Sequence, residues 1–108
     1  MSDEIRNAVI NDATIEISDH GILTSWLALD YGGLSQGFGG RVLLKRGSGD
    51  TRNYAGWWLL RVLEVAGVRN WDALVGKTIR VRRRDDLVVA IGHIVKDDWF
   101  SPEADWGS

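Results

Sequence analysis

The chain contains no cysteine, so it has no disulfide, no thiolate metal site and no cysteine nucleophile. It has two histidines, and its acidic residues do not fall at the spacing of a metal site, so we expect no metal. Arginine and lysine are outnumbered by aspartate and glutamate, 13 to 15. This balance argues against coating nucleic acid by bulk charge, although a local basic patch remains compatible with it.

Membrane and catalytic signatures are also missing. No apolar run approaches the roughly 18 residues that cross a bilayer, and residues 1–4 lack the basic and apolar blocks of a signal peptide. Phosphate-loop, dinucleotide-binding and nucleophile-elbow patterns are absent. We therefore expect a cytoplasmic protein with no membrane partner, no cofactor and no catalytic residues, and not an enzyme.

The length of 108 residues suits one domain with one core, which we place at residues 1–108. We expect an ordered core over about residues 5–102 and an acidic, aromatic C-terminal tail. Six residues are tryptophan and one is proline. Tryptophan is enriched both in small cores and at interfaces, so the excess is compatible with either use.

Alternating and helical patterns predict five strands and one helix. The helix runs from about Tyr54 to Ala66, with Thr51 or Asn53 as its cap and Gly67 as its stop. The predicted strands cover residues 9–18, 22–30, 38–44, 78–84 and 87–95. The order β-β-β-α-β-β predicts an α+β fold. We expect a small twisted antiparallel sheet or a partly open barrel, OB-like or SH3-like, with one main helix packed on it.

Five of the thirteen glycines fall within residues 31–41, YGGLSQGFGGR. One explanation is a ligand rim, in which Tyr31 or Phe38 stacks, Gln36 forms hydrogen bonds and Arg41 pairs with an anion. The other is a wide hairpin whose glycines allow a bulge and close strand packing. We favour close packing and keep the ligand rim as the alternative.

Two further groups are candidates for contact with a partner. Arg80, Arg82 and Arg84 alternate along one strand face, which suits phosphate or an acidic surface, or a solvated face paired with neighbouring carboxylates. Trp57 and Leu60 lie opposite the apolar face of the predicted helix, so either a second layer covers them or they mark a contact surface.

The histidines allow one catalytic alternative. His20 and His93, with an aspartate, can form an acid–base pair only if the fold brings them into one pocket. His93 lies on an apolar strand face, so we favour a buried histidine with satisfied hydrogen bonds.

Several motifs together resemble a family of small uncharacterised proteins encoded by phages and prophages. The resemblance covers about residues 9–102 and rests on the motifs DHGILT (19–24), LDYGG (29–33), QGFGG (36–40), WDALVGKTIRV (71–81) and IGHIVKDDWFSP (91–102). It implies an accessory phage protein in the cytoplasm of an infected or lysogenic bacterium, and it assigns no site residues.

From these observations we expect a protein that acts by binding, as a homodimer and as an anti-defence inhibitor. Its target is a host defence protein or a small anionic nucleotide signal. The predicted contact residues are Tyr31, Gln36, Phe38, Arg41, Trp57, Arg80, Arg82 and Arg84. One alternative is an OB-like module that binds single-stranded nucleic acid through Trp57, Trp71 and Trp99. A small hydrolase using the histidines is less favoured.

Overall fold

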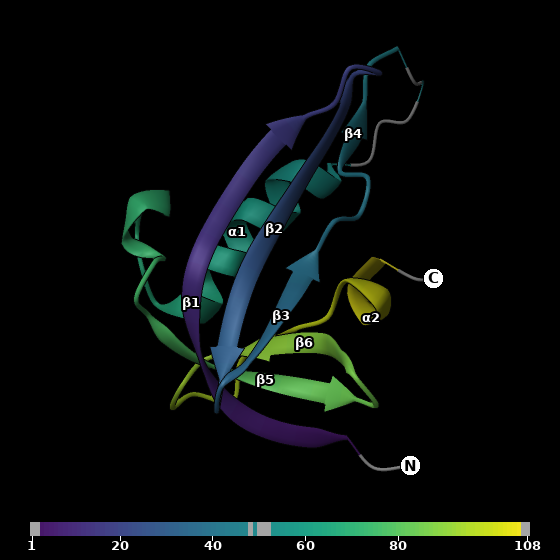
Figure 1. Cartoon of the computed structure of the whole chain (residues 1–108). Coiled ribbons are helices and arrows are strands. Elements are labelled where there is room, and N and C mark those ends of the chain that lie inside the picture. The colour runs from purple at the N-terminus through teal and green to yellow at the C-terminus, as the bar shows by residue number, and fades with distance from the viewer. Residues whose placement is uncertain (1–2, 48, 50–52, 107–108) are drawn as a thin grey trace.

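A computed structural model describes residues 3–47, 49 and 53–106 and shows a small α+β fold (Figure 1). One open antiparallel sheet packs against one main helix, α1 (Tyr54–Ala66). The strands are β1 (Glu4–Ile17), β2 (Ile22–Tyr31), β3 (Leu34–Gly39), β4 (Leu44–Lys45), β5 (Thr78–Arg84), β6 (Leu87–Gly92) and β7 (Trp99–Phe100). A 3₁₀ turn, η1 (Trp71–Ala73), follows α1, and a short helix, α2 (Pro102–Trp106), follows β7.

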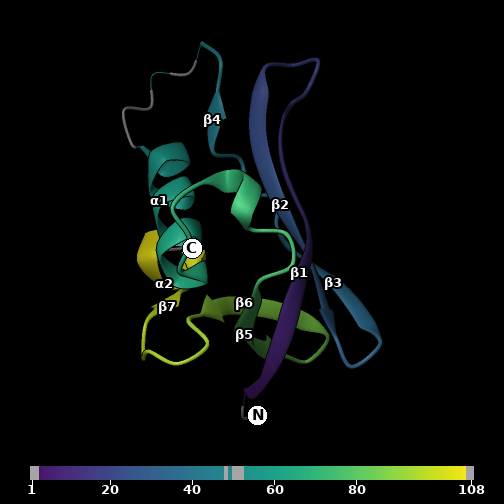
Figure 2. The same ribbon diagram turned by 90° about the vertical axis from the view of Figure 1, so that its left-hand side faces the viewer.

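The sheet order is β3-β2-β1-β5-β6-β7, and β4 pairs with Ile22 and Leu23 of β2, on the same edge as β3. The long strand β1 belongs to two ladders. Glu4–Val9 pairs with β5 and Val9–Ile17 pairs with β2, with a register shift between Ile10 and Asp12. Figure 2 shows β1 and β2 rising past the level of β5 and β6, so the sheet curls around the core while β3 and β6 remain unjoined.

The structure confirms the predicted α+β class and the single main helix. Asn53 caps α1 by accepting a 2.8 Å hydrogen bond from the Gly56 N–H. Gly67 ends the helix in the left-handed region at φ +73°, which glycine adopts without strain. Thr51, the other predicted cap, lies outside the described residues.

Strand boundaries required correction at three places. The first strand begins at Glu4 rather than Val9, because β5 adds a second ladder to it. The predicted strand 38–44 is divided into β3 and β4, because positive φ angles at Gly39 and Gly40 turn the chain away. The last long strand ends at Gly92 rather than Val95, and sequence patterns missed both β7 and α2.

The core lies between the curled sheet and α1. Trp58 on α1 stacks on Phe38 of β3 at a ring distance of 5.4 Å, and Phe100 of β7 meets both rings edge-on. Apolar side chains of β1, β2, β5 and β6 complete this core. These rings bring β3, α1 and β7 together, so the aromatic cluster positions both sides of the gap between β3 and β6.

Among the described residues, no helix is both long enough and apolar enough to cross a membrane.

Candidate binding site

A groove lies between β3 and β6, the strands that flank the opening of the sheet (Figure 1). Within the described part of the chain no ladder joins them: β3 pairs with β2, while β6 pairs with β5 and briefly with β7. The groove has a volume of about 270 Å³ and is lined by Trp26, Gly37, Phe38, Gly39, Arg41, Leu87, Val88, Val89, Pro102 and Glu103. The lining is mainly apolar, and Arg41 and Glu103 are its charged groups.

Trp26 presents an aromatic ring to this groove, and the glycine-rich stretch supports the ring. A Cβ built on Gly37 would lie 3.0 Å from the indole, and one built on Gly40 would overlap it. The indole is nevertheless 44% exposed. The glycines therefore let one side of the ring rest on the backbone while the rest of its surface stays open to solvent.

Close packing thus accounts for much of the glycine-rich stretch. Gly39 has the same use on the inner face, where a Cβ would lie 2.8 Å from the ring of Trp58. The sequence analysis did not single out Trp26 as a stacking residue. Its signal lies in the hairpin register, because Trp26 pairs with Gly39 and lies beside Gly37.

The four predicted rim residues have different environments. Tyr31 is 2% exposed and its hydroxyl is buried without a hydrogen-bond partner among the described residues, so it is a core residue rather than a stacking surface. Phe38 lines the groove but is 4% exposed, because its ring is packed against Trp58. Gln36 is half-buried on β3 and does not line the groove.

Arg41 is the predicted rim residue that remains available to a ligand. It is exposed, lines the groove and forms no ion pair or hydrogen bond with another described residue. An unpaired guanidinium beside an apolar wall suits a carboxylate or phosphate, because its planar N–H groups can bind two oxygens at once.

A second hollow of about 280 Å³ adjoins the groove and shares Val89 and Glu103 with it. Arg82 and Arg84 from β5 contribute to its lining, together with residues of β6 and α2. Two of the three predicted stripe arginines therefore lie together near the groove.

The stripe arginines differ in whether a carboxylate already pairs with the guanidinium. Arg84 donates to Asp3 at 3.1 and 3.3 Å, and this hydrogen bonding lowers the pKa of the Asp3 carboxyl. Arg82 lies over the ring of Trp99 at 4.4 Å and has no ion pair within the described residues. Among the described residues that line the two hollows, Arg82 and Arg41 are thus the arginines without an acidic partner.

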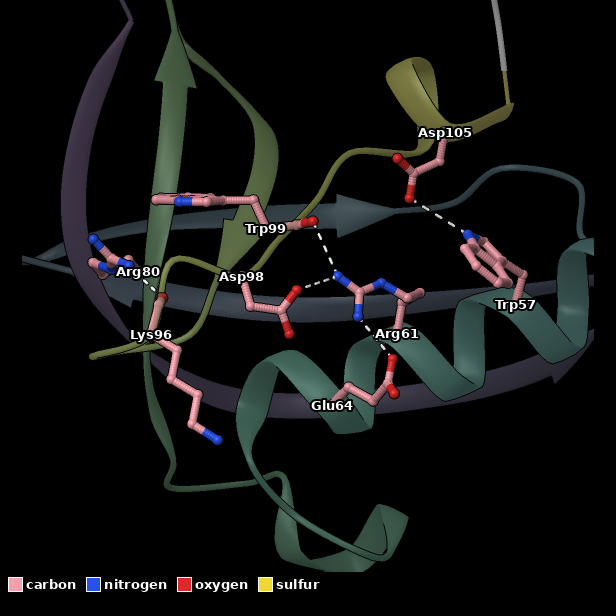
Figure 3. A network of polar contacts seen from close by, with 8 residues as sticks. All are labelled: Trp57, Arg61, Glu64, Arg80, Lys96, Asp98, Trp99 and Asp105. Carbon is pink, nitrogen blue, oxygen red and sulfur yellow. Dashed lines mark hydrogen bonds and ion pairs between the residues drawn. The ribbon is translucent and has the colours of Figure 1, made fainter.

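Arg80, the third member of the stripe, supports the structure. Its Nε donates to His93 O at 2.7 Å. Its Nη2 donates to Lys96 O at 2.8 Å (Figure 3). Its guanidinium also lies 4.9 Å from the ring centre of Trp99. Arg80 therefore holds the loop between β6 and β7 and lines neither hollow.

Arg83 is a further arginine that the predicted stripe left out. It points inward, with a side chain only 14% exposed, and lies 5.2 Å from the ring centre of Tyr31. It donates to Glu4 at 2.9 Å, so it joins β5 to the start of β1. The pairing of β5 with β6 shifts register between Arg82 and Arg83.

Trp57 lies on the outer side of α1, as the helical pattern predicted, and it is 43% exposed. Its Nε1 donates to Asp105 of α2 at 3.4 Å (Figure 3). It lines neither of the two hollows, so the structure does not bring it together with Arg41.

A polar network on α1 fixes the segment that leads into α2 (Figure 3). Arg61 donates to Glu64 at 2.7 Å, to Asp98 at 2.6 Å and to Trp99 O at 3.1 Å. The hydrogen bond from Arg61 lowers the pKa of the Asp98 carboxyl. Because Pro102 and Glu103 follow directly, this network also positions one side of the groove.

The two histidines do not meet. His20 is in the turn between β1 and β2, and His93 follows β6, so they lie at opposite ends of the molecule (Figures 1 and 2). Nδ1 of His93 accepts from the backbone N–H groups of Val95 and Lys96, each at 3.0 Å. The geometry required for a shared histidine pocket is therefore absent, and His93 organises its loop instead.

Comparisons with protein-family models, with curated proteins and with solved structures found no match to this chain. The resemblance to small phage proteins therefore stays a prediction from sequence.

Proposed function

We propose that this protein acts by binding, without catalysis, and that its groove takes a small anionic ligand with a flat ring, of the nucleotide class. The observation that carries this proposal is Trp26 lining the same groove as Arg41, with the indole open to solvent and the guanidinium unpaired among the described residues. A nucleobase stacks on indole, and a phosphate accepts hydrogen bonds from guanidinium.

The size of the site supports a small ligand. Groove and adjoining hollow are about 270 and 280 Å³, near the lower end of the range of small-molecule sites. A ligand with a second phosphate would extend past Val89, which lines both hollows, and place that phosphate near Arg82. Glu103 opposes phosphate at this wall, but its carboxylate can accept a hydrogen bond from a base amino group or a sugar hydroxyl.

In biological terms, we place this activity in the cytoplasm of an infected or lysogenic bacterium, as the resemblance to phage proteins implies. There the protein would sequester a nucleotide signal that host defence systems use. Direct inhibition of a host defence protein is the alternative target within the same role.

Calorimetry against mononucleotides, linear dinucleotides and cyclic dinucleotides at low salt tests the proposal. We expect heat from at least one class, and an affinity reduced at least tenfold in W26L and in R41Q. W57L is the matched control, because Trp57 is equally exposed but lies outside the groove. The absence of heat and of any rise in Tm across the panel would contradict nucleotide capture, and so would equal losses in W26L and W57L.

A second candidate is binding of single-stranded nucleic acid, favoured by the arginines of two adjoining hollows. Of the three tryptophans predicted to stack, Trp71 donates to Ala13 O at 3.3 Å and Trp99 packs on Gly92 beneath Arg80 and Arg82. The third, Trp57, lines neither hollow, so stacking beside these arginines would fall to Trp26. This candidate requires affinity that rises with oligonucleotide length and falls steeply with salt, so an oligothymidine series separates it from nucleotide capture.

A further inference from the structure

The C-terminal part of β1 has one edge that no described strand covers. Pairing with β5 ends at Val9, and the last bonds on that side join Ile10 to Gly76 and Lys77. Pairing with β2 on the other side continues to Ile17. In Figure 2 this part of β1 extends beyond β5.

The hydrogen-bond pattern shows which backbone groups face this edge. Leu43 N–H donates to Leu23 O, so the backbone of Leu23 is turned toward β4 and away from β1. Its register partner, Ile17, therefore turns its own N–H and C=O away from β2. By alternation, Ile15 and Ala13 do the same.

Only part of the edge is protected. Trp71 donates to Ala13 O, and Asp12 Oδ1 accepts from Ala13 N–H, so the groups of Ala13 have partners. Ile15 and Ile17 share one face of the strand and are 47% and 58% exposed. The segment has no lysine or proline, which natural edge strands use against strand pairing.

We propose that a second copy of this chain pairs antiparallel along this edge, with Ile15 opposite the partner's Ile15. In this pairing the outward-facing residues Ala13, Ile15 and Ile17 must pair with outward-facing residues of the partner. At least two such pairs form within this segment only when the register is centred on Thr14, Ile15 or Glu16. Centring on Glu16 places two carboxylates face to face. Centring on Thr14 places Asp12 against the partner's Glu16, another like-charge pair that is unfavourable across strands.

The register centred on Ile15 removes both conflicts. Glu16 then faces the partner's Thr14, a hydroxyl donor. Ile17 faces the partner's Ala13, which must exchange its bonds to Asp12 and Trp71 for backbone bonds to Ile17. Apolar side chains of both copies form one row on the same face, which covers the exposed isoleucines. This interface uses the edge of β1 that faces away from β2, and none of residues 13–17 lines the groove, so it does not rest on the proposed function.

Sedimentation velocity from low micromolar to submillimolar concentration gives the first test, and we expect a monomer–dimer equilibrium. The register is tested by I15C and I17C in a chain that has no other cysteine. Residues in a hydrogen-bonded antiparallel pair are about 5.5 Å apart at Cα, within disulfide range, so I15C should cross-link rapidly. I17C faces the partner's Ala13 and should not. A monomer throughout, or I17C cross-linking as fast as I15C, would overturn the proposal.

A charge exchange tests the same register without cross-linking. T14E places a carboxylate opposite the partner's Glu16 and should weaken the dimer at least tenfold. The double variant T14E/E16K restores opposite charges across the interface and should recover the original dissociation constant. Tm of the dilute monomer shows whether each variant folds. Equal dissociation constants for T14E and T14E/E16K would refute the register.

Discussion

Arg61 on α1 donates a 2.6 Å hydrogen bond to Asp98, and the same guanidinium reaches Trp99 O at 3.1 Å. The Arg61 side chain is only 14% exposed, so this ion pair is better shielded than most surface pairs. It ties the main helix to the segment that delivers Pro102 and Glu103 to the groove. One side chain on α1 therefore influences the shape of a site formed by other elements.

The C-terminal segment should pack less firmly against α1 at acid pH. The bond from Arg61 lowers the pKa of Asp98 below its ordinary 3.8, so its contribution to stability is complete above that value. The contribution is lost as the pH falls through the lower folded value. We expect the hydrogen-exchange protection factors of residues 99–106, relative to unstructured peptide, to fall below about pH 4. D98N should show faster exchange already at neutral pH and less pH dependence, and loosening of the native segment above about pH 5 would contradict this assignment.

Substitution of Gly40 should destabilise the fold beyond its backbone cost. Gly40 has φ +77° and a Cβ there would overlap Trp26, whereas Gly33 has φ +84° and no neighbour within 4 Å. G33A should cost about 1 kcal/mol from conformation alone. G40A should cost about 1–3 kcal/mol more. Urea unfolding measures both, and adding W26L to G40A should recover part of the difference, whereas simple additivity would exclude the contact as its cause.

Two replacements of Trp58 should separate the stability that its ring packing contributes from the cost of its unsatisfied indole N–H. Trp58 is 1% exposed and stacks on Phe38, and its buried Nε1 has no hydrogen-bond partner in the part of the chain that the structure describes. W58A should cost about 3–5 kcal/mol through loss of packing. W58F keeps a ring and removes the unsatisfied donor, so it should cost clearly less in thermal or urea unfolding. Equal costs would show that the indole makes contacts that a phenyl ring cannot replace.

Arg80 and Arg82 should respond differently to the same substitution. Both lie over Trp99, but Arg80 also donates to His93 O and Lys96 O. R80Q should therefore release the loop between β6 and β7 and raise amide exchange in residues 93–98. R82Q, the matched control, should leave that exchange near its native rate while reducing affinity for a ligand that extends into the second hollow. Similar exchange in both variants would argue against the anchoring role of Arg80.

Local patterns were sufficient for the helix and most strands. Residues 54–66 have apolar side chains at helical spacing. Asn53 and Gly67 cap the two ends through hydrogen bonds to backbone groups only a few residues away. Such signals are contained in a few consecutive residues. The β3–β4 break is different, since it depends on the φ angles of Gly39 and Gly40, and glycine permits either sign of φ.

The candidate site was harder to predict because tertiary contacts define it. Trp26 lines the groove only through its register against the glycines of β3. Tyr31 carries the same kind of ring, but it is enclosed at the end of β2, with Arg83 lying over its ring. Arg80 differs from Arg82 because a loop sixteen residues farther along the chain folds back on it.

The pairing of β1 with both β2 and β5 also bears on the rate of folding. Its pairing with β2 is a local hairpin, but Glu4 meets Arg83 across a sequence separation of 79 residues. Bringing such distant segments together carries a large chain-entropy cost, and topologies rich in these contacts fold slowly. We therefore expect pairing of Glu4–Val9 with β5 to limit the folding rate, and side-chain changes there should alter the rate in stopped-flow refolding more than changes in the hairpin.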